Sequence, residues 1–140
     1  HSYDILGDAV STAARIESKC KEYGCLLLVG GDTYKHTKND FFYLKVDDLA
    51  VKGKTIGIEL YTVLDIKRTK YAKAKQMHND MYTHYLNQEF NRAISLCEKL
   101  EDAFDGKMKG YYAMWIERCE FQKTQTLPAD WDGIFIATSK

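Results

Sequence analysis

The first forty residues combine one long helical pattern with a short apolar run. Asp8 is a good N-cap, and apolar residues then recur at steps of three and four up to Gly24, which predicts a helix ending at this glycine. The apolar stripe of this helix consists of Ala9, Ala13, Ile16 and Cys20. The run Cys25–Val29 is bounded by glycines and predicts a buried strand. Asp32 is then expected to cap a short helix that ends near Thr37.

Two runs with strand periodicity follow. Phe41–Val46 is rich in aromatic residues, and alternate apolar positions place three side chains on one face: Phe42, Leu44 and Val46. Ile56–Val63 alternates in the same way. Between the two runs, Val51–Lys54 contains a glycine and suits a turn. The pattern therefore predicts an antiparallel pair of strands with an irregular connection.

Beyond Asp65 the apolar periodicity becomes helical. It continues from about Arg68 to Lys123 and, with its interrupting glycines, predicts three helices. The stretch Leu86–Leu100 is similar to part of one tetratricopeptide-type (TPR-like) hairpin, and a single repeat of that kind cannot bury its own apolar face. We therefore expect this tail to pack on the α/β part or on a partner chain.

The C-terminal segment differs from the helices before it. It begins at Pro128, and Ile134 and Ile136 alternate as in a short strand. Trp131 is expected to anchor this terminus by burial. Taken together, the patterns predict an α/β (α+β) fold in two parts: residues 1–65, and a helical extension over residues 66–140.

Composition narrows the possible partners. The 20 basic and 20 acidic residues balance, so no basic field indicates nucleic acid or an anionic membrane. No segment approaches the roughly 20 apolar residues that span a bilayer. The four cysteines form no CxxC pair, which favours small buried thiols in a reducing cytosol. The chain opens at His1, directly before a motif, so we expect a fragment of a longer protein, whose other parts could anchor it to a membrane.

That motif is the segment Tyr3–Glu17, which reads Tyr-Asp-Ile-Leu-Gly-Asp-Ala-Val-Ser-Thr-Ala-Ala-Arg-Ile-Glu. It resembles the class III adenylyl and guanylyl cyclase pattern Asp-Ile-x-Gly-x-x-Val-Asn-x-Ala-x-Arg-Leu/Met-Glu/Asp. The apolar run at 25–29 and the turn at 51–54 match later elements of that family in the right order. The resemblance covers roughly residues 1–65, and the tail is similar to the extension of some bacterial adenylate cyclases. It implies the C-terminal portion of a ferredoxin-like cyclase domain that converts ATP to cyclic AMP and pyrophosphate.

The resemblance also implies roles for four residues. Arg15 would supply a planar, charged donor fork to the phosphate oxygens in the transition state. Ser11 stands where the family has an Asn, so it offers one shorter hydrogen-bond donor. Asp4 occupies the position that accepts a hydrogen bond from the adenine amino group, which favours ATP over GTP. Lys52 matches a lysine near the triphosphate.

The part of the family's site that binds metal ions is absent from this chain. Its two Mg²⁺ or Mn²⁺ ions are bound by aspartates on earlier strands, and its sites form across a head-to-tail homodimer. Asp47 and Asp48 are neighbours in a predicted strand, where successive side chains point to opposite faces, so we expect no metal site there. We therefore expect the isolated chain to be inactive and, because half of the sheet is missing, to self-associate or rearrange its tail.

Two alternatives stay open. A cyclase-like domain that no longer catalyses could serve as a regulatory dimerisation or nucleotide-binding module, an alternative that Ser11 supports. Alternatively, the helical tail could be a protein-interaction unit with a protein partner of its own.

Overall fold

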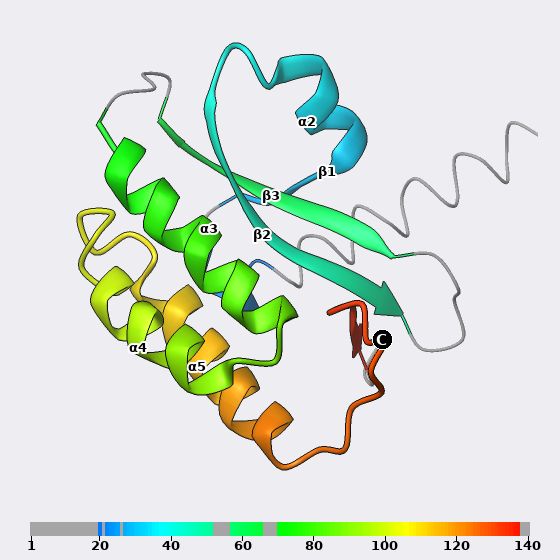
Figure 1. Ribbon diagram of the computed structural model, residues 1–140. Helices are drawn as coiled ribbons and strands as arrows, with labels where there is room; N and C mark the ends of the chain where they lie inside the picture. Colours follow the sequence, from blue (N-terminus) through cyan, green and yellow to red (C-terminus); the bar gives the residue numbers. More distant parts are fainter. Residues whose placement is uncertain (1–19, 21, 26, 52–56, 66–69, 138–140) are drawn as a thin grey trace, which may run out of the picture.

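A four-stranded sheet forms the centre of the molecule (Figure 1). The computed structural model describes residues 20, 22–25, 27–51, 57–65 and 70–137. Across the sheet the strands stand in the order β1–β3–β2–β4, with these bounds: β1 Val29–Gly30, β2 Phe42–Val51, β3 Ile58–Asp65 and β4 Phe135–Ala137. β3 is antiparallel to both β1 and β2, whereas β4 is parallel to β2. The predicted antiparallel pair and the α/β fold class are thereby confirmed.

The strand predicted over residues 25–29 is only partly formed. β1 begins at Val29 and pairs with β3 alone, so it lies at an edge of the sheet. Cys25 and Leu28 are buried, but Leu27 is 50% exposed. The predicted buried strand over 25–29 is therefore shorter than expected and only partly buried.

Helix α2 (Gly31–Thr37) covers one face of the sheet. Its Tyr34 ring stacks on Tyr61 of β3, with centroids 3.8 Å apart, and also contacts Tyr43 of β2. The helix ends at Thr37 as predicted. It begins one residue before Asp32, and no side chain caps it, so the predicted capping role of Asp32 was wrong. The Asp32 carboxylate lies instead in the first turn, where the helix dipole favours negative charge.

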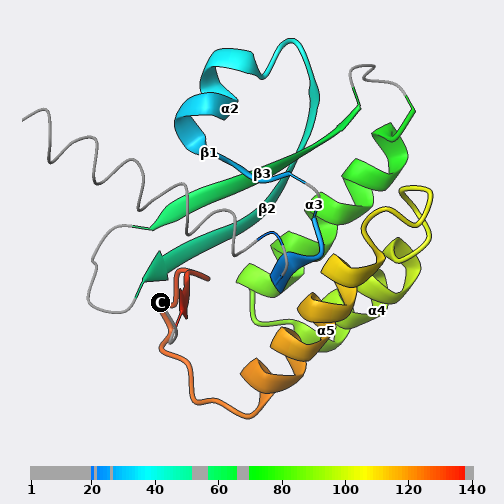
Figure 2. The ribbon, with the colours of Figure 1, turned by 180° about the vertical axis from the view of Figure 1, so that it is seen from behind.

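Three helices cover the other face: α3 (Ala72–Leu86), α4 (Phe90–Leu100) and α5 (Lys109–Lys123). Figures 1 and 2 show α3 and α5 next to the sheet and α4 on the outside of the group. α4 buries one stripe against its two neighbours, composed of Phe90, Ala93, Cys97 and Leu100. The predicted three helices are confirmed, and they pack on the sheet of their own chain.

The C-terminal segment returns to the sheet (Figure 2). Trp131 packs against Tyr85 and Phe90, with ring centroids 5.1 and 5.8 Å apart. The chain then forms β4, which pairs with residues 49–51 of β2. The predicted short terminal strand is confirmed, and it covers part of one edge of the sheet.

The core lies between the sheet and the three helices, and it is unusually aromatic. Its largest fully buried side chains include Trp115, Tyr23, Tyr85, Tyr111 and Tyr112. The cysteines in the described residues are all free thiols, and Cys25, Cys97 and Cys119 are buried. Among the described helices, none is both long and apolar enough to cross a membrane.

Candidate functional site

The four predicted site residues lie outside the described residues: Asp4, Ser11, Arg15 and Lys52. The structure does describe the chain that flanks them. Cys20, Glu22 and Tyr23 are helical and belong to the last turn of the helix predicted to carry Ser11 and Arg15, while β2 ends at Val51, immediately before Lys52. The contacts that hold these flanking residues in place are described below.

A β-bulge in β2 determines which side chains face the helices. Lys45 lies opposite Tyr61 and Asp47 lies opposite Leu60, so Val46 is an extra residue in the ladder. The bulge breaks the alternation of buried and outward positions, and both Val46 and Asp47 are fully buried. The alternation predicted from Phe42, Leu44 and Val46 would place Asp47 on the face opposite Val46, and the bulge instead buries both side chains.

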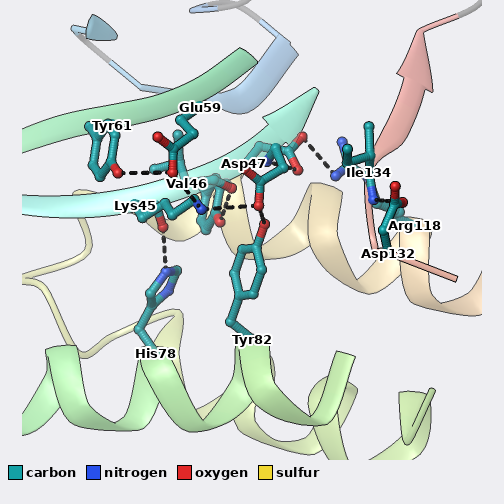
Figure 3. Close-up of polar contacts among 12 residues, drawn as sticks. Lys45, Val46, Asp47, Glu59, Tyr61, His78, Tyr82, Arg118, Asp132 and Ile134 are labelled. Atoms are coloured by element: carbon teal, nitrogen blue, oxygen red, sulfur yellow. Dashed lines mark hydrogen bonds and ion pairs between the residues drawn. The ribbon is translucent and has the colours of Figure 1, made fainter. Parts of the chain in front are cut away.

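The carbonyl groups at the bulge accept hydrogen bonds from side chains of the helical tail. The hydroxyl of Tyr111 on α5 donates to the Val46 carbonyl at 2.5 Å. Nε2 of His78 on α3 lies 2.7 Å from the Lys45 carbonyl, which can only accept. Figure 3 shows His78 rising from α3 toward β2. The irregular strand and the tail therefore complete each other's hydrogen bonds.

Asp47 is the centre of a buried polar network. Its Oδ2 accepts from the Tyr23 hydroxyl at 2.6 Å and from Nη1 of Arg118 at 2.8 Å. Its Oδ1 accepts from the backbone N–H of Asp48 at 2.9 Å. Burial raises the pKa of Asp47, and the charge of Arg118 together with these hydrogen bonds opposes that rise. We call Tyr23, Asp47 and Arg118 the buried triad.

Arg118 connects α5 to the sheet and to the terminal strand. Its side chain is only 3% exposed, and its guanidinium carbon lies 4.0 Å from the ring centroid of Phe135 on β4 and 4.9 Å from that of Trp115. Burial alone would lower the pKa of Arg118, but the neighbouring Asp47 carboxylate raises it above its ordinary value. The group is therefore a paired cation that aromatic faces surround.

His78 is buried in its neutral form. Burial lowers its pKa to about 4, against the weaker opposing effect of its bond to the Lys45 carbonyl. Because that carbonyl requires a proton on Nε2, Nδ1 is the acceptor and the Tyr112 hydroxyl donates to it at 2.9 Å. His78 therefore acts as a fixed bridge between α3, α5 and β2.

A more exposed polar cluster lies beside the triad. Lys45 pairs with Asp48 and Glu59, each at 3.1 Å, and the Tyr82 hydroxyl donates to Asp48 at 2.9 Å. Both aspartates of the 47–48 pair are thus bonded to cationic and hydroxyl donors. In the part of the chain that the structure describes, no cluster of three His, Cys, Asp or Glu side chains could hold a metal ion.

The buried triad was not predicted as a site, although the sequence holds a signal for it. Arg118 stands in the apolar stripe of α5 between Trp115 and Cys119, and a charged residue in such a stripe requires a buried partner. Asp47 carries no such signal, because the alternation through Phe42, Leu44 and Val46 places it on the opposite face and only the bulge turns it inward. The sequence therefore indicates that Arg118 needs a buried partner without identifying Asp47.

Comparison with known proteins finds two adenylate cyclases. The chain is 33% identical, over 105 residues and 68% of its length, to the terminal-differentiation specific adenylate cyclase of Dictyostelium discoideum. It is 37% identical, over 62 residues and 42% of its length, to an adenylate cyclase of Anabaena cylindrica. No family model and no solved structure matches.

These matches relate the chain to adenylate cyclases, and they cover little of the relatives themselves. The aligned segments span 5% of the Dictyostelium protein and 12% of the Anabaena protein. An aligned segment that covers 68% of this chain must include α3, at whichever residue the segment begins. The similarity therefore extends beyond strands β1–β3 into the helical tail.

Proposed function

We propose that this chain is a segment of the catalytic unit of a class III adenylate cyclase, which converts ATP to cyclic AMP and pyrophosphate. The observation that carries the proposal is the identity to two adenylate cyclases, one of them over 68% of the chain. The motif from Asp4 to Glu17, which resembles the cyclase pattern, supports the same activity from within the sequence. In this proposal the segment is the C-terminal part of the catalytic domain.

The proposed chemistry requires donors aimed at a developing negative charge. Attack of the ribose 3′ oxygen on the α-phosphorus builds charge on the transferred phosphoryl group, and fixed donors stabilise it. Arg15 supplies a charged fork and Ser11 one hydroxyl donor, and their spacing of four residues places both on one face of the predicted helix. Lys52 adds a point charge near the triphosphate. Asp4 accepts from the adenine amino group and disfavours guanine, which carries a carbonyl there.

The divalent ions belong to another part of the proposed site. In the described residues Asp47 and Asp48 are occupied by Arg118, Tyr23, Lys45 and Tyr82, so they do not fit a magnesium or manganese site. We propose that aspartates outside this chain hold the ions in a head-to-tail homodimer. When bound, the ions would neutralise phosphate charge.

A cyclase assay of the longer protein containing this segment tests the proposal. Cyclic AMP formation from ATP with Mn²⁺ is measured for wild type, Arg15→Ala and Ser11→Asn. We expect Arg15→Ala to abolish turnover and Ser11→Asn to raise it, because the asparagine restores a longer donor. Removing one such donor typically costs about 2.7–4 kcal/mol of activation free energy.

The same assay includes two controls. Asp4→Asn should reduce the preference for ATP over GTP, and the 140-residue chain alone should form no cyclic AMP. Full activity of Arg15→Ala, or turnover by the chain alone, would show that the site is assigned wrongly.

A second candidate function follows from Ser11. If the family's asparagine is required, the segment is part of a degenerate cyclase domain that binds nucleotide or mediates dimerisation without turnover. ATP binding by calorimetry in the longer protein, together with absence of cyclic AMP even in Ser11→Asn, would favour this candidate.

A further inference from the structure

We propose that Cys20 and Cys25 form a redox-sensitive dithiol, which hydrogen peroxide converts into an intrachain disulfide at the end of the first helix. Both cysteines lie in the described part of the chain, and both are free thiols in the structure. This modification site is independent of the proposed function, because it uses none of the residues assigned to ATP.

The backbone at the helix end brings the two cysteines together. The N–H of Cys25 donates to the Cys20 carbonyl at 3.1 Å, and Gly24 has a φ of 64°. A bond from the sixth residue back to the first, with a left-handed glycine before its donor, is the Schellman motif that ends many helices. The two residues joined by this bond frequently pack their side chains against each other. Figure 2 shows this turn, in blue, beside α5.

The separation of the two residues suits a disulfide. Standard bond lengths place a carbonyl oxygen about 2.4 Å from the Cα atom of its residue, and an amide nitrogen about 1.5 Å from its own Cα atom. With the 3.1 Å hydrogen bond between them, the Cα atoms of Cys20 and Cys25 are at most about 7 Å apart. A disulfide requires Cα atoms within about 7 Å, so no large backbone movement is needed.

The side chains also lie near each other. Cys20 packs on the hydrophobic cluster to which Cys25 belongs. Burial and, after it, the negative charge of a Cys20 thiolate raise the pKa of Cys25 to about 12, an effect that requires the two sulfur atoms to be close. The Cys25 thiol donates weakly to the Tyr23 carbonyl at 3.6 Å, so little is lost when the sulfur changes partner.

Their different exposure determines the order of oxidation. Cys20 is half-buried, whereas Cys25 is 6% exposed, so peroxide reaches Cys20 first. The Cys20 thiolate attacks one peroxide oxygen, which gives a sulfenic acid and releases hydroxide. The Cys25 sulfur then attacks the Cys20 sulfur, and the Cys25 proton leaves with the sulfenic hydroxyl as water. In total two thiols are oxidised to one disulfide, and one peroxide is reduced to two waters.

The other two cysteines provide an internal comparison. Cys97 of α4 and Cys119 of α5 are both 0% exposed. Burial raises the pKa of Cys97, and a charge on Cys119 raises it further, so these two thiols are also neighbours. They differ from the first pair in having no exposed member. We therefore expect peroxide to leave them reduced.

The experiment maps the disulfide in the folded chain. The chain is treated with hydrogen peroxide under native conditions, the remaining thiols are alkylated, and tryptic peptides are analysed by mass spectrometry. Trypsin cleaves after Lys21 and Lys35, so the disulfide would join the peptide that ends at Lys21 to the peptide Glu22–Lys35. Circular dichroism before and after treatment shows that the chain stays folded.

Three variants assign the roles. Wild type and the matched control Cys97→Ala should both form the 20–25 disulfide, and dithiothreitol should reverse it. Cys25→Ala lacks the resolving thiol, so it should hold Cys20 as a sulfenic acid that dimedone traps. Cys20→Ala lacks the exposed thiol and should leave Cys25 reduced.

Four results would overturn the proposal. Absence of the 20–25 disulfide from folded, peroxide-treated wild type would contradict it directly. Disulfides between two chains through Cys20 would show that Cys25 is out of reach. Equal oxidation of Cys97 and Cys119 would mean that unfolding, and not the helix end, exposes the thiols. Oxidation of Cys25 in Cys20→Ala at the wild-type rate would show that Cys20 is not the first target.

Discussion

Gly24, after the first helix, lies against Gly110 at the start of α5 so closely that a Cβ atom on Gly24 would stand 3.1 Å from the Gly110 carbonyl carbon. Because both partners in this contact are backbone, neither can turn aside as a side chain can. Gly24 also has a φ of 64°, which side chains disfavour. The two glycines thus determine how closely α5 approaches the turn that follows the first helix.

We predict that Gly24→Ala destabilises the chain by about 2 kcal/mol or more, from the left-handed backbone and the crowding together. Gly110→Ala is the matched control, because its Cβ would lie at an ordinary 3.7 Å from Gly24 and alanine favours a helix. Urea denaturation followed by circular dichroism measures both. Equal stability of the two variants would contradict the close approach.

A second prediction concerns the buried ion pair between Arg118 and Asp47. Arg118→Met leaves a buried carboxylate without its cation, which should lower the free energy of unfolding by about 3–5 kcal/mol. Asp47→Leu combined with Arg118→Met removes both charges and should recover much of this loss. The difference between the double variant and the sum of the single variants, from urea denaturation, gives the coupling.

Lys123→Met is the control for this pair. Lys123 pairs with Glu120 at 3.3 Å on the surface of the same helix, where water screens the interaction. Its removal should leave stability unchanged within error. Additive losses at Asp47 and Arg118 would refute the predicted coupling.

The sequence predicted the structural features that depend on local periodicity. The stripes of the three tail helices, the β2–β3 pair and the terminal strand all follow from spacing within a dozen residues. The four proposed site residues rest on spacing of the same kind, and they lie outside the described residues. Their arrangement stays a prediction.

The features that the sequence did not predict depend on partners that are far apart along the chain. The bulge at Val46 turns Asp47 inward, and its cation is 71 positions away on α5. Local alternation assigned Asp47 and Asp48 to opposite faces, and the two residues pair with Leu60 and Glu59 in turn, but the pattern did not identify Arg118 as the buried partner of Asp47. Charge within an apolar stripe indicates that a partner exists, but only the tertiary structure identifies it.

A third prediction follows from neutral His78. Its pKa is about 4 in the folded chain, where burial lowers it from 6.5, so between these values the unfolded chain binds a proton that the folded chain does not. The free energy of unfolding should therefore fall as the pH drops from about 6.5 toward 4, by about 3 kcal/mol in total. Above pH 6.5 this contribution is fully present.

Comparison with His78→Gln isolates the effect. Glutamine does not titrate, and all other titratable groups are common to both proteins, so their contributions cancel in the difference between the two pH profiles. Urea denaturation at intervals between pH 4 and 8 gives the two slopes. Identical slopes would mean that His78 binds a proton as readily in the folded chain as in the unfolded chain, contrary to its contacts with the Lys45 carbonyl and Tyr112.

The last prediction concerns Trp131, which anchors the segment that ends in β4. Its half-buried ring packs on Tyr85 and Phe90, and Trp131→Ala should cost about 2 kcal/mol from the apolar area lost. With β4 detached, the amides of residues 49–51 should exchange faster and the uncovered edge of β2 should promote self-association. Hydrogen exchange by mass spectrometry and gel filtration measure these effects.

Ile136→Ala is the control, since that side chain is 59% exposed, and it should leave both the exchange and the self-association unchanged. Wild-type exchange at residues 49–51 in Trp131→Ala would show that backbone pairing with β2 holds β4 without this anchor.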